Sequence, residues 1–139
     1  PPKHYKVGHG MVAYVNQNDE FVVFYNGKKH DLLNYSPESY DIKDSLIIWN
    51  NQGFLNLFYG GEVMEVERYI PANAAMDWGT YSYLTENLQI DAVMHGVKMK
   101  VFNETLKDIF VYRNIIVIKY GNQSWAIHYR GKNYFLSDQ

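Results

Sequence analysis

The sequence contains no cysteine, and that absence excludes several kinds of site. The chain has no disulfide, no thiolate ligand for a metal ion and no cysteine nucleophile. It also has no apolar run close to the roughly 20 residues that a membrane-spanning helix needs, so we expect no membrane span. The redox compartment stays open, with an extracellular or periplasmic location slightly favoured.

Basic residues are not in excess either, because 13 Lys and Arg stand against 15 Asp and Glu, for a net charge of −2. Nucleic-acid-binding domains usually carry a basic face, so we expect no nucleic-acid partner. Aromatic residues are abundant at 17%, with 13 Tyr, and Tyr favours strands. The 139 residues suit one domain, and a start at Pro1-Pro2 without Met indicates a trimmed or mature fragment.

The strongest pattern is an internal repeat of about 35 residues. An apolar strand, a glycine and a second strand recur at 21–33, 55–67, 90–102 and 125–137. The glycines are 34, 35 and 35 residues apart, at Gly27, Gly61, Gly96 and Gly131. Each ends a pair that fits a two-residue hairpin turn, which requires positive φ. These pairs are Asn26-Gly27, Gly60-Gly61, His95-Gly96 and Arg130-Gly131.

Each repeat is predicted to hold four short strands, which we call A, B, C and D. Strands B and C form the hairpin; strand A is expected at 11–15, 46–49, 81–84 and 115–119, and strand D at 40–42, 74–76 and 109–111. The units would then span about 9–43, 44–78, 79–113 and 114–139, with an additional strand at 4–7. Together they would make residues 1–139 a single domain.

Strand B is apolar on both faces. One face carries Phe21, Leu55, Ile90 and Trp125, and the other carries Phe24, Phe58 and Val93. We expect the first set to be buried between sheets, because a sheet that is apolar on both faces must be covered on both. A ring of sheets satisfies this requirement, so we predict an all-β, four-bladed β-propeller of four-stranded antiparallel units. A β-solenoid and a fragment of a larger ring are the alternatives.

The chain ends indicate how such a ring would close. Residues 5–7 align with residues 40–42 at an offset of 35, so residues 4–7 form a D-type strand with no A, B or C before it. The last unit has no D strand of its own. We predict that residues 4–7 pair with about 132–136 and complete the final sheet, which would hide two sheet edges.

The hairpins resemble those of hemopexin-type four-bladed propellers, which share an aromatic strand, a Lys/Arg-Gly turn and an aromatic second strand. The nearest match is the segment RGKNYF at 130–135. The resemblance covers the B–C hairpins and implies a similar architecture. No functional residue is carried over from it.

The D–A and B–C turns share one face of a propeller, and polar residues that differ among the repeats gather there. We predict that a binding site on this face is made by His9, Asp44, Trp78, His95, Arg113 and Arg130. Turns are also polar and variable without any function, and this alternative stays open. The spacing of His9, Asp44 and Asp77 matches no metal motif, so we expect no metal site and no cofactor.

No nucleophile elbow, phosphate loop or dinucleotide fingerprint is present, so no catalytic residue is assigned. His30 and His128 fit packed histidines better than catalysts. The leading hypothesis is a non-catalytic binding or protein-interaction module, whose partner is an unidentified protein, small molecule or glycan. The alternative is a carbohydrate-active enzyme or a sugar-binding lectin with a site at the channel mouth. Enzymatic activity is left open, and a protein that is not an enzyme is favoured.

Overall fold

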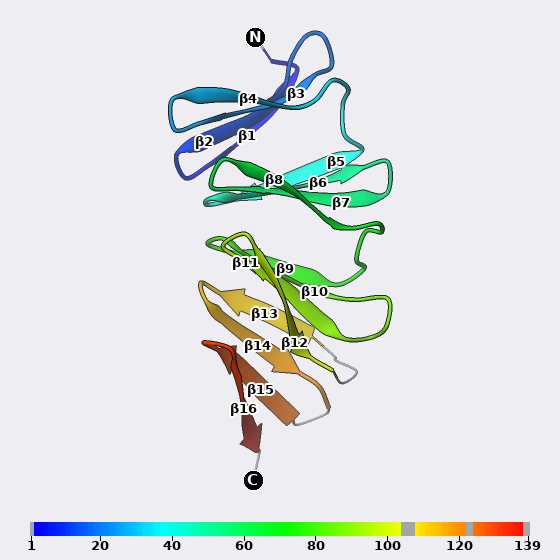
Figure 1. The fold of residues 1–139 in the computed structure, drawn as a ribbon, viewed down its shortest axis with the longest axis vertical. Helices are drawn as coiled ribbons and strands as arrows, with labels where there is room; N and C mark the ends of the chain where they lie inside the picture. Colours follow the sequence, from blue (N-terminus) through cyan, green and yellow to red (C-terminus); the bar gives the residue numbers. More distant parts are fainter. Residues whose placement is uncertain (1, 104–107, 122–123, 138–139) are drawn as a thin grey trace. The chain divides into compact units, whose positions relative to one another are not determined.

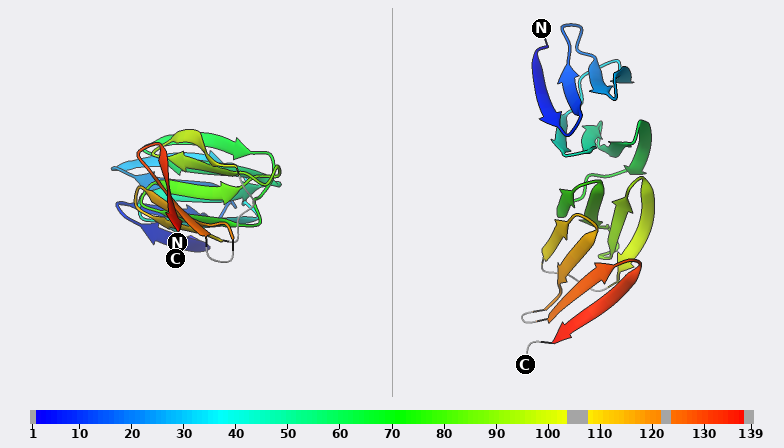
Figure 2. Two further views of the ribbon diagram at one scale, coloured as in Figure 1. Left: turned by 90° about the horizontal axis from the view of Figure 1, so that it is seen from below. Right: turned by 90° about the vertical axis from the view of Figure 1, so that its left-hand side faces the viewer.

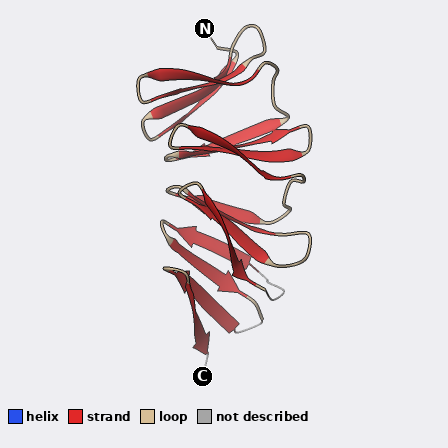
Figure 3. Cartoon of the chain, in the orientation of Figure 1, coloured by secondary structure: helices blue, strands red, loops and turns tan. Residues whose placement is uncertain are grey.

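The computed structural model describes residues 2–103, 108–121 and 124–137, and every regular element in them is a β-strand (Figures 1 and 3). In residues 1–70 these are β1 (His4–Gly8), β2 (Met11–Val15), β3 (Phe21–Tyr25), β4 (Lys28–Leu33), β5 (Ser39–Lys43), β6 (Leu46–Asn51), β7 (Phe54–Tyr59) and β8 (Glu62–Glu67). In residues 71–139 they are β9 (Ala74–Asp77), β10 (Thr80–Leu84), β11 (Ile90–Met94), β12 (Val97–Phe102), β13 (Asp108–Tyr112), β14 (Ile115–Lys119), β15 (Ser124–Tyr129) and β16 (Lys132–Ser137). No helix in these ranges could cross a membrane.

The strands form four antiparallel sheets of four strands each, in the orders β1-β2-β3-β4, β5-β6-β7-β8, β12-β11-β10-β9 and β13-β14-β15-β16. We call them the first to fourth sheets; Figure 2 shows their strands from two further sides. The predicted all-β class and four-stranded antiparallel units are confirmed. The strand expected to end each unit instead begins the next sheet: β5, for example, pairs with β6 from Ser39↔Asn50 to Lys43↔Leu46. Two-residue turns force their strands to pair, whereas the longer link at 34–38 lets the chain leave the sheet.

The N-terminal strand does not close the fourth sheet. β1 pairs with β2, from His4↔Val15 to Gly8↔Met11, and so becomes the edge strand of the first sheet. The predicted pairing of residues 4–7 with 132–136 is therefore wrong, because the fourth sheet already has its four strands and β16 pairs with β15. Closure into a four-bladed ring stays a prediction.

The B–C turns have the predicted backbone. Both residues of each turn have positive φ: 51° and 76° at Asn26-Gly27, 63° and 90° at Gly60-Gly61, 51° and 83° at His95-Gly96, and 51° and 78° at Arg130-Gly131. This is the left-handed pair of conformations that joins two twisted antiparallel strands through two residues. The repeated glycine therefore has a conformational cause in all four sheets.

The chain divides into two compact halves, residues 1–70 and 71–139, and each half holds two sheets. From here on, the first unit means residues 1–70 and the second unit means residues 71–139. In the first unit, one core is built between the first and second sheets. Its buried members are Met11, Ala13, Val15, Phe21, Val23, Tyr40, Ile47, Trp49 and Phe58. Phe21 lies at its centre, with ring centroids 4.9 Å from Tyr40 and 5.5 Å from Trp49.

In the second unit, the core lies between the third and fourth sheets. Its buried members are Ile90, Ala92, Val101, Phe102, Ile109, Ile116, Ile118 and Ala126. Phe21, Leu55 and Ile90 are buried as expected, but their counterpart Trp125 is only partly buried. The expectation for Trp125 is wrong because it lies on the face of the fourth sheet that points away from this core; its cross-strand partner on β14 is Lys119.

A polar contact joins the two sheets of the first unit beside their core. The hydroxyl of Tyr40 lies 2.9 Å from Nδ1 of His4, and Nζ of Lys6 donates to the backbone oxygen of Tyr40 at 2.7 Å. Tyr40 is buried, and desolvation raises its pKa above the ordinary value of 10.0. Burial therefore favours the neutral phenol in the folded chain.

We expect Phe21→Ala to lower the free energy of unfolding by about 3–5 kcal/mol, the range for truncating a buried phenylalanine. Phe24→Ala on the same strand is the matched control: Phe24 is 49% exposed, so its loss should be below about 1 kcal/mol. Urea denaturation followed by circular dichroism measures both. Equal losses for the two variants would contradict the placement of this core.

Alkaline pH provides a second test. Because the folded-state pKa of Tyr40 is raised, its stabilising contribution is complete below the unfolded-state value of 10.0 and is lost as the pH rises through the folded value. We expect Tyr40→Phe to show a smaller loss of stability than the wild type between pH 9 and about pH 11 in urea titrations. Tyr5→Phe, at an exposed position, should follow the wild type.

Candidate functional site

Four of the six predicted site residues come from turns at one end of the two sheets of residues 71–139. Trp78 lies in the β9–β10 turn and Arg113 in the β13–β14 turn. The guanidinium carbon of Arg113 lies 5.3 Å from the centre of the Trp78 ring, a cation–π contact. The backbone nitrogen of Arg113 donates to Oδ2 of Asp77 at 2.9 Å, which fixes the second turn against the first.

His95 joins the same group through its backbone. Its nitrogen donates to the backbone oxygen of Gly79 at 2.9 Å, so the β11–β12 turn lies against the turn that carries Trp78. Arg130 lies at the same end of the fourth sheet, in the β15–β16 turn, and its guanidinium carbon is 5.2 Å from the ring centre of Tyr129. We call Trp78, His95, Arg113 and Arg130 the turn rim.

All four residues of the turn rim are held in the left-handed backbone region. Their φ angles are 36° at Trp78, 51° at His95, 56° at Arg113 and 51° at Arg130. For residues with a Cβ other than Asn and Asp, this conformation costs roughly 1–2 kcal/mol. The equivalents of His95 and Arg130 in the first unit are Asn26 and Gly60, which adopt it cheaply. Bulky side chains therefore occupy positions where the fold alone favours Asn or Gly.

The two remaining predicted residues meet in the first unit. The backbone nitrogen of His9 donates to the backbone oxygen of Asp44 at 2.6 Å, which joins the β1–β2 turn to the β5–β6 turn. Gly8 is required at this contact, since a Cβ there would overlap the Asp44 oxygen. His9 and Asp44 thus connect two sheets through their backbones. This contact belongs to the unit of residues 1–70, whereas the turn rim belongs to the unit of residues 71–139.

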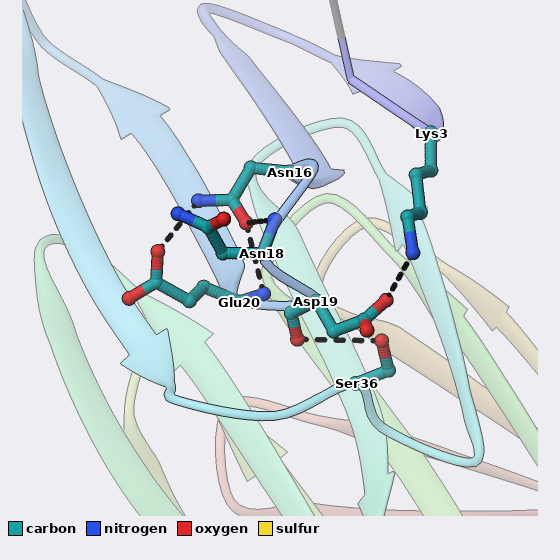
Figure 4. A network of polar contacts seen from close by, with 6 residues as sticks. All are labelled: Lys3, Asn16, Asn18, Asp19, Glu20 and Ser36. Atoms are coloured by element: carbon teal, nitrogen blue, oxygen red, sulfur yellow. Dashed lines mark hydrogen bonds and ion pairs between the residues drawn. The ribbon is translucent and has the colours of Figure 1, made fainter.

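The loop at the opposite end of the first sheet uses its polar groups internally (Figure 4). Oδ1 of Asn16 accepts hydrogen bonds from the backbone nitrogens of Asn18 at 2.9 Å and Glu20 at 3.0 Å. Its Nδ2 donates to Oε1 of Glu20 at 2.8 Å. Lys3 pairs with Asp19 at 2.6 Å. These side chains hold the β2–β3 loop in shape, which is a structural role.

A hollow of about 370 Å³ lies in the second unit, and none of the predicted residues is in its lining. It is lined by Gln89, Lys100, Val101, Phe102, Asn103 and Asn133. Within this lining, Asn133 donates from Nδ2 to the Val101 oxygen at 2.8 Å. Oδ1 of Asn133 lies 2.8 Å from Nδ1 of buried His128. Through Asn133, His128 takes part in the contact between two sheets. This agrees with the prediction that it is a packed histidine. His30 likewise packs against Phe58, with ring centroids 5.3 Å apart.

Asp77 is the residue that sequence reasoning left out of the site. It is buried and holds the Arg113 turn in place. The available signal is its position beside Trp78 in a D–A turn, on the face that the sequence predicts to bind. Within the described residues, no group of three or more His, Cys, Asp or Glu side chains could hold a metal ion.

The comparisons with known proteins agree with this architecture. The model of a family described as the 10-bladed beta propeller domain matches residues 1–134. The matching family is not the hemopexin family, so that resemblance extends to blade architecture alone. A search of curated proteins found no match.

Two solved structures share the fold at low identity. HIRA(644-1017) matches with a TM-score of 0.56 and 11% identity, over 99% of this chain and 57% of that one. The N-terminal domain of Nup159 matches with a TM-score of 0.50 and 8% identity, over 95% of this chain and 46% of that one. Hsv2 from Kluyvelomyces marxianus matches with a TM-score of 0.49 and 13% identity, over 91% and 47%. The chain thus spans about half the length of these structures.

The strained turns yield a stability test. We expect His95→Asn to raise the free energy of unfolding by about 0.5–1 kcal/mol, because Asn-Gly is the preferred pair for this turn. The reverse change in the first unit, Asn26→His, should lower it by a similar amount. Urea midpoints of both variants measure the effect. A loss of stability in His95→Asn would mean that the histidine side chain, and not its backbone, is needed by the fold.

Proposed function

Because the chain belongs to the 10-bladed β-propeller domain family, whose model matches residues 1–134, we propose that it is a non-catalytic protein-interaction module that binds through the turn rim. Such binding needs only that the D–A and B–C turns lie at the same end of each blade. It does not depend on the number of blades in the ring. Turns carried by a rigid scaffold are a common place for binding residues.

One observation carries this proposal: Trp78, His95, Arg113 and Arg130 all stand at positive φ. Strain of this kind lowers stability, and residues that keep it often serve a function. Trp and Arg are also the residues most often found at binding hot spots. The four turn-rim residues have side chains that disfavour positive φ, and Trp and Arg suit binding. Together these properties support an interaction role for this end of the sheets.

The chemistry of the turn rim indicates an acidic partner. Arg113 and Arg130 each present a guanidinium group, held over an aromatic ring at 5.3 Å and 5.2 Å. A guanidinium has five N–H donors in a fork that matches a carboxylate, and stacking reduces the freedom it loses on binding. The neighbouring Asp77 carboxylate already accepts the Arg113 backbone N–H. We therefore expect the partner to offer Asp or Glu side chains next to an apolar group that contacts Trp78.

A display library of random peptides tests the proposal. Selection on the wild-type chain should enrich peptides with Asp or Glu, and their binding should weaken as salt is raised. In the double variant Trp78→Asn with Arg113→Asn, affinity should fall at least about thirtyfold, since hot-spot residues contribute 2 kcal/mol or more. Asn tolerates the left-handed region, so both turns should keep their backbone.

Leu88→Asn is the matched control, because Leu88 also has positive φ, at 62°, and is 54% exposed in the β10–β11 loop at the other end of its sheet. Peptide binding should be unchanged in this variant. Peptides that bind the turn-rim variant as well as the wild type would refute the proposal. Binding to a glycan array through the turn rim, without peptide enrichment, would favour the sugar-binding alternative instead.

A further inference from the structure

One cross-strand pair differs in chemistry between the two units. In the second sheet, Phe58 on β7 lies opposite Val63 on β8, and Phe58 belongs to the core of the first unit. At the corresponding position of the fourth sheet, His128 on β15 lies opposite Asn133 on β16. The second unit therefore has a polar pair where the first unit has an apolar pair. The apolar pair shows that the packing of two sheets does not itself require polar groups at this position.

Asn133 connects this polar pair to the third sheet. Its Nδ2 donates to the backbone oxygen of Val101 at 2.8 Å, and its Oδ1 lies 2.8 Å from Nδ1 of His128. Because an amide oxygen only accepts hydrogen bonds, Nδ1 of His128 carries the hydrogen and donates it. The two contacts fix the orientation of the Asn133 amide. They leave it one N–H donor and one acceptor lone pair for a ligand.

The polar pair has a cost in stability. His128 is 4% exposed, and its Nε2 has no hydrogen-bond partner among the described residues. A buried polar atom without a partner lowers stability, so its presence in a native structure calls for an explanation. A phenylalanine avoids this cost, as Phe58 does in the first unit. The retention of His128 and Asn133 therefore indicates a use beyond packing.

Asn133 also lines the hollow of about 370 Å³ in the second unit. This volume lies near the low end of the range of about 300–1,000 Å³ for pockets that hold small molecules. The hollow lies where β12 and β16 come together, since the rings of Phe102 on β12 and Phe135 on β16 have centroids 6.0 Å apart. Three of its six lining residues carry side-chain amides: Gln89, Asn103 and Asn133.

The lining indicates a neutral ligand that carries several hydroxyl groups. An amide offers donors and an acceptor together, and a hydroxyl group is likewise a donor and an acceptor. None of the described lining residues is acidic, so the hollow does not suit a cation. Its one basic residue, Lys100, lies opposite Asp91 in the β11–β12 pair, so an acidic residue already neighbours this charge. A saccharide is a class of small molecule that combines neutrality with closely spaced hydroxyl groups.

We propose that this hollow binds a neutral saccharide, with Asn133 in contact with the sugar and His128 as the residue that positions Asn133. The remaining donor and the remaining acceptor of the Asn133 amide match two neighbouring hydroxyl groups of one sugar ring. Gln89 and Asn103 supply further donors and acceptors from the third sheet. None of the turn-rim residues lines the hollow, so this site is separate from the surface to which we assign protein binding.

Saturation-transfer difference NMR tests the proposal with glucose, galactose, mannose and N-acetylglucosamine. Each sugar is added to the full chain at up to about 10 mM, which reveals dissociation constants in the millimolar range. At least one of the four should receive saturation from the protein, and a titration of that sugar gives its dissociation constant. Because the ligand is neutral, added salt should leave the affinity unchanged.

The double variant His128→Phe with Asn133→Val installs the pair that the second sheet uses. It should raise the dissociation constant for the sugar at least about tenfold, because the hydrogen bonds of the Asn133 amide are lost. Its thermal unfolding midpoint should equal or exceed that of the wild type, since the unsatisfied Nε2 is removed. Loss of binding is thereby separated from loss of the fold.

The positioning role of His128 has its own readout. His128→Phe alone should weaken binding although Asn133 remains, because Oδ1 of Asn133 loses the donor that orients it. His128→Asn keeps an N–H donor near the place of Nδ1 and should bind the sugar more tightly than His128→Phe. The smaller asparagine leaves a gap and should lower the unfolding midpoint. A merely structural role predicts the opposite order, with affinity following stability.

Two further variants serve as controls. Lys100→Gln removes the charge from the lining but keeps a hydrogen-bonding side chain, so affinity for a neutral sugar should be retained. The turn-rim variant Trp78→Asn with Arg113→Asn should also bind the sugar like the wild type. Retained binding in both variants, together with its loss in the double variant at 128 and 133, supports the proposal.

Four results would overturn it. No saturation transfer to any of the four sugars means that the hollow is not a site for neutral saccharides. Equal binding by the wild type and by the double variant at 128 and 133 places the sugar elsewhere. Binding that is lost in the turn-rim variant places the sugar at the turn rim. Binding that weakens with salt and is lost in Lys100→Gln means that the hollow recognises an anion.

Discussion

The structure depends on the apolar character of both faces of every sheet. A strand such as FVVFY at 21–25 has apolar side chains in both directions, so neither face of its sheet can remain in water without a cost in free energy. Stacking stabilises sheets of this kind, because a neighbouring sheet covers an apolar face. This is why Phe21 and Phe58 meet in one buried core although they belong to different sheets.

Apolar packing has little directional preference, so other contacts must set how neighbouring sheets are aligned. Hydrogen bonds near the sheet ends do this in both units. His9 donates to the Asp44 oxygen, Arg113 donates to Asp77, and Asn133 donates to the Val101 oxygen. Each has specific geometry and joins one sheet to the next. The turns therefore align the sheets as well as reverse the chain.

The same turns impose the backbone conformation on which a binding role would depend. Two-residue hairpins need residues at positive φ, and Asn26-Gly27 meets this need at little cost. Where Trp78, His95 or Arg113 stands instead, the side chain points from a turn that disfavours it. The fold remains stable because the sheets are held by their cores, so the turns can accept strain. The strands thus supply the stability of the fold, and the side chains that differ among the four repeats are concentrated in the turns.

Glycine spacing and strand periodicity are local properties, so the amino-acid sequence is enough to predict the repeat, the hairpins and the all-β class. It also placed Trp78, His95 and Arg113 in turns at one end of their sheets, since that follows from the order of the strands. Tertiary structure alone decided that β1 and β5 begin sheets, because which neighbour a strand pairs with depends on contacts across a link such as 34–38. It alone decided that Trp125 lies on an open face while Phe21 is buried, because the two have the same local pattern and differ only in whether another sheet covers them.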